Sequence, residues 1–274
     1  MSISNKSYDV AYIGASDVNR DIDINTIKQK TGLNGINLGQ DGSCVEENFT
    51  LFKKFIYNGN HVKHLFIQLY VTDLDSSMRF DINTEKFIPF VKDSVVGSML
   101  QRNVSPFRFF LWKYVPFAAY AEYNSKYPLE DFFYPADRKK LFDSLNKNSG
   151  TELLQESGHK FTNGPAYSSA LVIDENITKF ISFAKSRGIK ITVITLPRWI
   201  SWVKRHSNRR AFTEKIDSLC KKNSISYFNF ASDKQQWFNN DSLFYDNNHF
   251  NRNGAIYFSS VFADSVLLKE IERK

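Results

Sequence analysis

The chain has 274 residues, of which 42% are hydrophobic and 24% are charged, and its formal net charge is +7. This is the composition of an ordinary soluble globular chain, long enough for one large α/β core or for a core with a sizeable insertion. Two cysteines, Cys44 and Cys220, exclude a disulfide framework and a CxxC metal site. We expect both to be buried thiols, and a pairing between them cannot be read from the sequence.

The first residues lead almost at once into an apolar run, with no signal peptide or membrane-spanning segment. We therefore expect a cytoplasmic location for the sequence as given, or a periplasmic or cell-envelope location if it was trimmed from an anchored precursor. The positive charge favours acidic partners, such as an anionic polysaccharide. Because no recognised nucleic-acid-binding module surrounds the basic residues, we expect no nucleic-acid partner.

Apolar runs that alternate with helical patterns predict the fold. The predicted strands are 8–13, 35–38, 64–71, 189–196 and 225–230. The predicted helices are 22–30, 44–57, 172–186, 211–222 and 253–268. Strands that are apolar on both faces and alternate with helices indicate a parallel sheet between helical layers. We predict a three-layer α/β/α sandwich with a five-stranded, flavodoxin-like sheet.

The stretch 75–169 interrupts this alternation. It is rich in aromatic residues and contains no clear strand, so we expect a mainly helical insertion within a single domain of residues 1–274. Within it, residues 105–123 are expected to be helical and 146–164 to form a polar loop. Such an insertion could shape a substrate cleft or lid. Alternatively, the aromatic side chains simply fill a second small core.

A possible nucleophile follows the first strand. Ser16 lies in Gly14-Ala15-Ser16-Asp17, where the strand should give way to a turn and then a helix. A serine hydroxyl is a weak nucleophile at neutral pH and needs an imidazole to take its proton as it attacks. Without such a partner, a Gly-x-Ser sequence after a strand is more often only a turn.

A matching base is found before the last predicted helix, in Asp246-Asn247-Asn248-His249. Three positions apart, the Asp246 carboxylate can fold back onto the His249 ring, fix its tautomer and stabilise the imidazolium. An isolated Asp-x-x-His motif is weak evidence for catalysis, since such a histidine is often a surface or capping residue. Together with Ser16 at the other end of an α/β pattern, the pair predicts a Ser–Asp–His triad.

A basic and aromatic cluster follows the strand 189–196. In a parallel sheet the segment after a strand lies on the face where ligands bind, so Arg198, Trp199 and Trp202 are candidate contacts for an anionic or sugar-bearing substrate. The alternative is that these residues are the solvated side of a helix.

Three sequence blocks resemble those of the SGNH (GDSL-like) hydrolase superfamily, in particular its bacterial polysaccharide-associated acyl esterases and O-acyltransferases. The blocks are Gly14-Ala15-Ser16-Asp17, Asn37-Leu38-Gly39 and the segment 246–255. The resemblance covers residues 8–74 and 170–268. It implies a nucleophilic Ser16, a triad completed by Asp246 and His249, and an oxyanion hole that includes backbone amides of Ser16, Asp17 and Gly39. The implied substrate is a small acyl ester or an acylated carbohydrate, with no metal or other cofactor.

The chain departs from the superfamily after its third strand. The usual Gly-x-Asn-Asp block, whose asparagine donates to the oxyanion, has no counterpart in the segment 68–75, where Thr72 is the candidate substitute. Loss of one oxyanion donor costs about 2.7–4 kcal/mol of transition-state stabilisation. The first block also lacks the usual aspartate before its serine.

The sequence also leaves other functions to be weighed. The missing asparagine is compatible with a non-catalytic carbohydrate- or partner-binding module on the same scaffold. A metal-dependent phosphoesterase would recruit Asp17, Asp73 and Asp75, with His249, although such carboxylates are more often caps and turn formers. An α/β-hydrolase fold fits less well, because it requires Gly-x-Ser-x-Gly deep in the chain. Here Val18 occupies the place of the last glycine, and Ser16 lies near the N-terminus.

Overall fold

We describe the protein from a computed structural model. The described residues are 3–75, 81–115, 117–119, 121–122, 153–154, 170–199, 204, 206–231 and 240–269.

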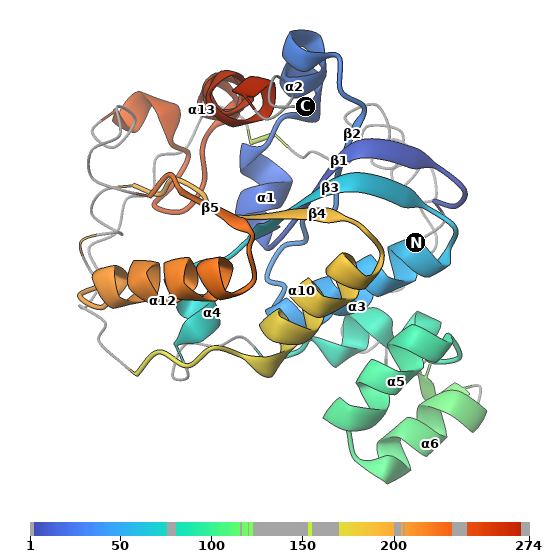
Figure 1. Ribbon diagram of the computed structural model, residues 1–274. Helices are drawn as coiled ribbons and strands as arrows, with labels where there is room; N and C mark the ends of the chain where they lie inside the picture. The colour runs from blue at the N-terminus through green and yellow to red at the C-terminus, as the bar shows by residue number, and fades with distance from the viewer. Residues whose placement is uncertain are drawn as a thin grey trace.

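A five-stranded parallel sheet forms the centre of the molecule (Figure 1). Its strands are β1 (Ser7–Ile13), β2 (Gly35–Asn37), β3 (His61–Gln68), β4 (Lys190–Thr195) and β5 (Ser226–Asn229). They lie in the order β2-β1-β3-β4-β5, and every pairing is parallel. The predicted flavodoxin-like sheet is therefore confirmed.

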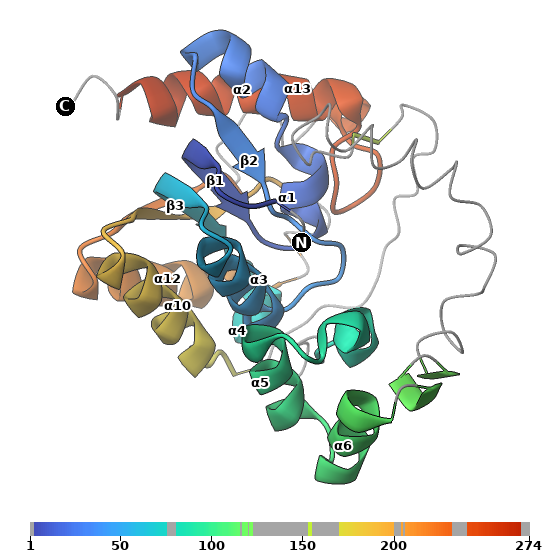
Figure 2. The ribbon, with the colours of Figure 1, turned by 90° about the vertical axis from the view of Figure 1, so that its right-hand side faces the viewer.

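Helices cover both faces of the sheet (Figures 1 and 2). The helices of one layer are α3 (Val45–Tyr57), α10 (Glu175–Ser186) and α12 (Arg209–Lys222). Those of the other layer are α1 (Ser16–Asp21), α2 (Ile24–Thr31) and α13 (Arg252–Phe262), which continues as a π-helical turn over Ala263–Leu267. Successive strand residues point to opposite faces, so Leu65 and Ile67 pack with the first layer and Phe66 with the second. This produces the three-layer sandwich expected from the sequence.

Several element boundaries differ from the prediction, and at two of them the type of element changes. The strand expected at 64–71 is β3, which ends at Gln68, and the short helix α4 (Val71–Leu74) follows. Because Tyr70 N–H donates to the Asp73 carboxylate at 2.6 Å, a helical turn begins within a largely apolar run. Residues 16–21 form α1, whereas the sequence predicted that the first helix starts at Ile22. The Asp23 side chain then caps α2.

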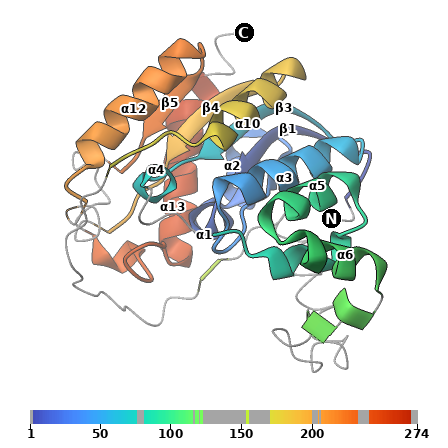
Figure 3. The ribbon, with the colours of Figure 1, turned by 90° about the horizontal axis from the view of Figure 1, so that it is seen from below.

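Residues after β3 form a small helical lobe beside the sandwich, on the side of α3 (Figure 3). Its elements are the 3-10 helix η1 (Thr84–Phe90), α5 (Ser94–Asn103) and α6 (Pro106–Tyr114). The buried Trp112 and Leu100 belong to a separate apolar cluster that the three elements share. The described part of the insertion is therefore mainly helical and has its own small core.

The predicted helix 105–123 is interrupted, since α6 ends at Tyr114. The predicted polar loop 146–164 lies outside the described residues, except for positions 153 and 154. Among the helices that the structure describes, none combines the length and apolar character needed to cross a membrane.

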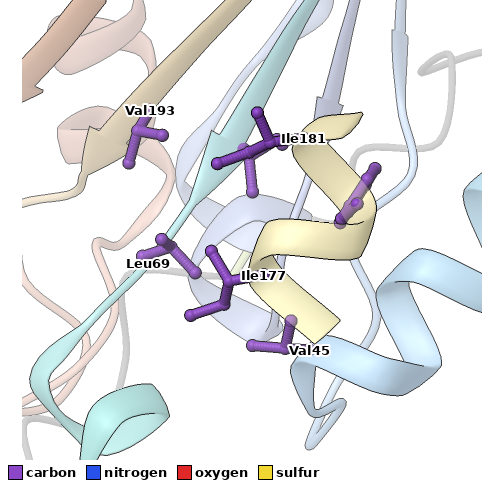
Figure 4. A pocket seen from close by; sticks show the side chains of 7 residues that line it. Val45, Leu69, Ile177, Ile181 and Val193 are labelled. Carbon is purple, nitrogen blue, oxygen red and sulfur yellow. The ribbon is translucent and has the colours of Figure 1, made fainter. Parts of the chain in front are cut away.

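A small cavity between the sheet and the first helical layer is lined by apolar side chains alone. Figure 4 shows it between α3, α10 and the ends of β3 and β4. Its lining is Val45, Ile67, Leu69, Ile177, Phe180, Ile181 and Val193. With no polar group to orient a ligand, we regard it as part of the core.

Both cysteines are free and buried. Burial raises the pKa of the Cys44 thiol to about 11 and that of Cys220 to about 12. The reactive thiolate form is therefore scarce at neutral pH, and neither residue is a candidate nucleophile.

Candidate active site

The carboxyl ends of three adjacent strands bring the candidate site together. Ile13 at the end of β1 pairs with Ile67 of β3, and Tyr12 pairs with Asn37 at the end of β2. The segments that follow these strands therefore meet at one edge of the sheet, which is where open parallel sheets bind ligands.

Ser16 lies at the turn between β1 and α1. The turn is held against β3, because Ala15 N–H donates to the Gln68 side-chain oxygen at 3.2 Å. Gly14 is required for this approach, since a Cβ there would collide with the Gln68 side chain and with Val18. The turn directs Ser16, which is half-buried, towards the loop before α13.

The loop carrying His249 is closed on itself. Tyr245 N–H donates to the His249 carbonyl at 2.9 Å, next to an antiparallel bridge between Phe244 and Phe250. Asp246 Oδ1 accepts the N–H groups of Asn248 at 2.7 Å and His249 at 2.8 Å. The aspartate therefore holds the loop backbone as well as the imidazole.

Ser16, His249 and Asp246 form a continuous line of hydrogen bonds. The Ser16 Oγ lies 2.8 Å from His249 Nε2, and both oxygens of Asp246 lie 3.0 Å from Nδ1. These distances are within the range needed for proton transfer from a nucleophile to a base. The structure therefore brings together the three residues that the sequence selected, from positions 233 residues apart.

The environment of Asp246 keeps its carboxyl group ionised. Burial raises its pKa, but the hydrogen bonds from His249 and from the Asn248 and His249 amides outweigh this effect, so the pKa lies below its usual value. An ionised acceptor at Nδ1 leaves Nε2 as the nitrogen that receives the serine proton.

Gly39 does not present a free donor in this structure, contrary to the sequence expectation. Its N–H donates to Asn37 Oδ1 at 2.9 Å. A side chain at Gly39 would collide with the backbone of Val18 and Asn19 in α1. The glycine is therefore explained by the close packing of this loop on α1. Its N–H, which was expected to donate to an oxyanion, is hydrogen-bonded within its own loop instead.

The other expected oxyanion donors occupy suitable elements. Ser16 and Asp17 are the first two residues of α1, and the first N–H groups of a helix have no carbonyl partner within it. Thr72 is half-buried at the second position of α4. Its role as the third donor stays a prediction.

Arg198 is turned inward and is not exposed as a substrate contact. Its side chain is 10% exposed, and Nε and Nη2 lie 3.0 and 2.6 Å from Asp17 Oδ2. Its expected substrate contact is therefore corrected to an internal ion pair. Trp199 is partly buried and packs edge-on against Phe244, so its substrate role stays a prediction. Trp202 lies outside the described residues.

The carboxylates proposed for a metal site have other partners. Asp17 pairs with Arg198, and Asp73 accepts the Tyr70 N–H. Asp75 is fully buried at a bridge with Leu171. Among the residues that the structure describes, no three His, Cys, Asp or Glu side chains are grouped so as to hold a metal ion.

Sequence reasoning missed several residues that support the site. The Asn37 side chain donates to the Val18 carbonyl at 2.6 Å, and Asp21 Oδ1 accepts the Phe250 N–H at 2.9 Å. Gln68 holds the nucleophile turn. Their polar character at the end of a buried strand or on a buried helix was the available signal, but their partners are distant in the sequence.

No family model matches the sequence, and no curated protein matches it. Among solved structures, the chain is similar to a protein described as a G-D-S-L family lipolytic protein from Desulfitobacterium hafniense, with 11% identity, a TM-score of 0.47 and coverage of 95% of this chain and 99% of that chain. It is also similar to a GDSL-like lipase from Bacteroides thetaiotaomicron, with 11% identity, a TM-score of 0.42 and coverage of 98% and 88%. These similarities are distant, so the chemistry of the site rests on its own geometry.

Proposed function

We propose that this protein is a serine-dependent ester hydrolase or O-acyltransferase that works through an acyl-Ser16 intermediate. The observation that carries this proposal is the line from Ser16 Oγ to His249 Nε2 at 2.8 Å, continued by Asp246 at Nδ1. It is the arrangement of nucleophile, base and orienting carboxylate that acyl transfer requires.

In the first step, Ser16 Oγ attacks the ester carbonyl carbon while its proton passes to His249 Nε2. The Asp246 carboxylate stabilises the imidazolium without taking the proton. The backbone N–H groups of Ser16 and Asp17 are the donors that we assign to the developing oxyanion, with Thr72 as a further candidate. His249 then gives its proton to the leaving alkoxide as the carbon–oxygen bond breaks.

In the second step, an acceptor hydroxyl gives its proton to His249 and attacks the acyl carbon, which releases Ser16. Water as acceptor completes hydrolysis, and a sugar hydroxyl completes transfer, so both reactions use the same residues. We propose acylated carbohydrate, including anionic polysaccharide, as the substrate class. This is supported by the net charge of +7 and by the resemblance of the sequence blocks to polysaccharide-associated enzymes.

Covalent labelling tests the nucleophile. We expect a fluorophosphonate to add one label to the protein at Ser16, as measured by intact mass and peptide mapping, with hydrolysis of an aryl acetate lost in parallel. The Ser16→Ala variant should neither take up the label nor hydrolyse the aryl acetate. Ser186→Ala is the matched control, because that exposed serine lies at the end of α10, away from the site. A folded, unlabelled wild-type protein would refute the proposal.

A partition experiment distinguishes the acceptors. Aryl acetate turnover is measured with increasing oligosaccharide, and transfer predicts an acylated sugar product, while hydrolysis predicts only free acid. Glycan binding that survives Ser16→Ala, without turnover on any ester, would instead support a binding module. Hydrolysis of a phosphoester that a chelator abolishes would support a metal-dependent phosphoesterase.

A further inference from the structure

A second carboxylate lies beside the base, on the residue that follows the nucleophile. Asp17 is 1% exposed, and its Oδ2 accepts both Arg198 contacts. Arg198 is fixed in turn, because its guanidinium carbon lies 4.0 Å from the centre of the Tyr70 ring. The position of the Asp17 carboxylate is therefore set by a buried cation.

The other oxygen of Asp17 faces His249. Oδ1 is buried, makes no hydrogen bond within the described part of the chain, and lies 3.8 Å from His249 Nε2. A buried carboxylate oxygen without a donor is costly to retain. Nε2 is the nitrogen that gains a proton when Ser16 attacks, so a positive charge develops next to this oxygen.

We propose that Asp17 is a positioning residue for the reaction, whose free oxygen stabilises the protonated form of His249 while Ser16 is acylated. This inference rests on the proposed function. The proton itself moves only between Ser16 Oγ, His249 Nε2 and the leaving or incoming oxygen. Arg198 holds Asp17 in place and limits its effect, since the cation offsets part of the carboxylate charge.

Several other carboxylates lie around the His249 loop, and their burial and partners differ. Asp246 acts on the opposite nitrogen, from the same loop. Asp21, on α1 with Asp17, accepts the Phe250 N–H, and burial together with the Asp17 charge raises its pKa well above the usual value, which favours its neutral form. Asp41, after β2, is ion-paired with Arg20, and its side chain is 45% exposed. Among these carboxylates, Asp17 is the buried charge that faces the proton-accepting nitrogen.

The first test is the pH dependence of aryl acetate hydrolysis by Asp17→Asn. Removing the carboxylate disfavours the protonated ring, so we expect the acid limb of kcat/KM to move to lower pH by about one unit. That shift corresponds to roughly a 10-fold change in equilibrium, and we expect a similar fall in the limiting kcat/KM. A folded variant with an unmoved acid limb would overturn the inference.

Arg198→Gln supplies the opposite test. With its cation removed, the Asp17 charge acts at full strength, so we expect the acid limb to move to higher pH. A merely structural pair would not displace the limb in opposite directions in the two variants. Either single variant could fail to fold because a buried charge is left unpaired. In that case the double variant Asp17→Asn/Arg198→Gln is measured instead, and its acid limb of kcat/KM is expected at lower pH than that of the wild type.

The exposed pair Arg20–Asp41 is the matched control. Replacing it by Gln and Asn should move the limb by less than about 0.3 unit, because solvent screens exposed charges. A second readout does not depend on turnover. The NMR titration midpoint of the His249 ring, assigned with His249→Gln, should fall in Asp17→Asn and rise in Arg198→Gln. A protein without turnover but with these shifts would refute the proposed function alone, and unmoved midpoints would refute this inference.

Discussion

The His249 loop and the helical lobe are held in place by different forces. In the loop, Asp246 accepts two backbone amides, and Phe250 N–H donates to the buried Asp21. The lobe is instead tied to α3 through ion pairs whose side chains are partly exposed, apart from the buried Glu47, which also accepts the Asn83 N–H. These pairs are Lys54–Asp93 at 2.6 Å, Lys86–Glu47 at 2.9 Å and Arg102–Glu46 at 2.8 Å.

The two kinds of contact have different consequences for activity and for stability. Hydrogen bonds with buried groups fix the atoms of the proposed triad against small displacements, and removing one partner leaves a polar group unsatisfied. Exposed ion pairs contribute little to stability and are screened by salt. The comparison predicts that changes in the loop alter activity first, whereas changes in the lobe alter its local stability.

The largest expected effect belongs to the loop. Asp246→Asn should lower kcat/KM on an aryl acetate by on the order of 10⁴-fold, because an amide in place of the carboxylate favours the wrong tautomer of His249. Steady-state kinetics measures the loss, and circular dichroism checks that the fold is retained. Activity within 10-fold of the wild type would show that His249 needs no carboxylate partner.

The lobe should respond in stability and not in catalysis. Trp112 is 2% exposed in the lobe cluster, so Trp112→Ala should destabilise the lobe by about 3–5 kcal/mol. Hydrogen exchange of α5 amides such as that of Leu100 would accelerate, while those of α13 would not. We expect kcat/KM to stay within about threefold. A larger loss of activity would mean that the lobe supports the site.

A smaller, pH-dependent effect is expected at Asp21. Burial and the charge of Asp17 raise the pKa of this carboxyl in the folded protein. Its contribution to stability is therefore complete below about pH 4, the unfolded value, and is lost as the pH rises towards the folded value. Asp21→Asn should gain unfolding free energy relative to the wild type across this window, as measured by urea denaturation.

Asp21→Leu is the control for this prediction. Leucine offers no acceptor to the Phe250 N–H, so this variant should be less stable than the wild type at every pH. Equal pH slopes for Asp21→Asn and the wild type would show that the carboxyl is not neutralised in the folded state.

The smallest effect is expected on the outer face of the lobe. Phe107 is 72% exposed on α6, so Phe107→Ser should change the unfolding free energy by less than about 0.5 kcal/mol. Thermal denaturation measures this difference. A drop of more than about 2 kcal/mol would indicate that the side chain is covered in solution.

The order of strands and helices was predictable because apolar periodicity reports burial directly. The end of β3 was not, since its apolar run continues through Leu69 to Val71 while the backbone changes from strand to helix. The helical start depends on the Asp73 carboxylate reaching Tyr70 N–H, which hydrophobicity does not report.

The triad was predictable for a related reason. Asp246 and His249 are close in sequence, so their contact follows from local geometry, and Ser16 follows from its place after a strand. The pair Asp17–Arg198 joins residues 181 positions apart, and nothing local indicated it. Gly39 was expected as an oxyanion donor from the family resemblance, and its close packing against α1 was not predicted.

The separation of Ser16 and His249 also has a consequence for biosynthesis. Ser16 is synthesised 233 residues before His249, its proposed base. Other contacts join the same two regions, including Asp23 N–H to Ser259 Oγ at 2.7 Å. A chain whose synthesis has not reached His249 therefore has Ser16 without its proposed base. Under the proposed function, the onset of ester hydrolysis during synthesis would report when α13 docks.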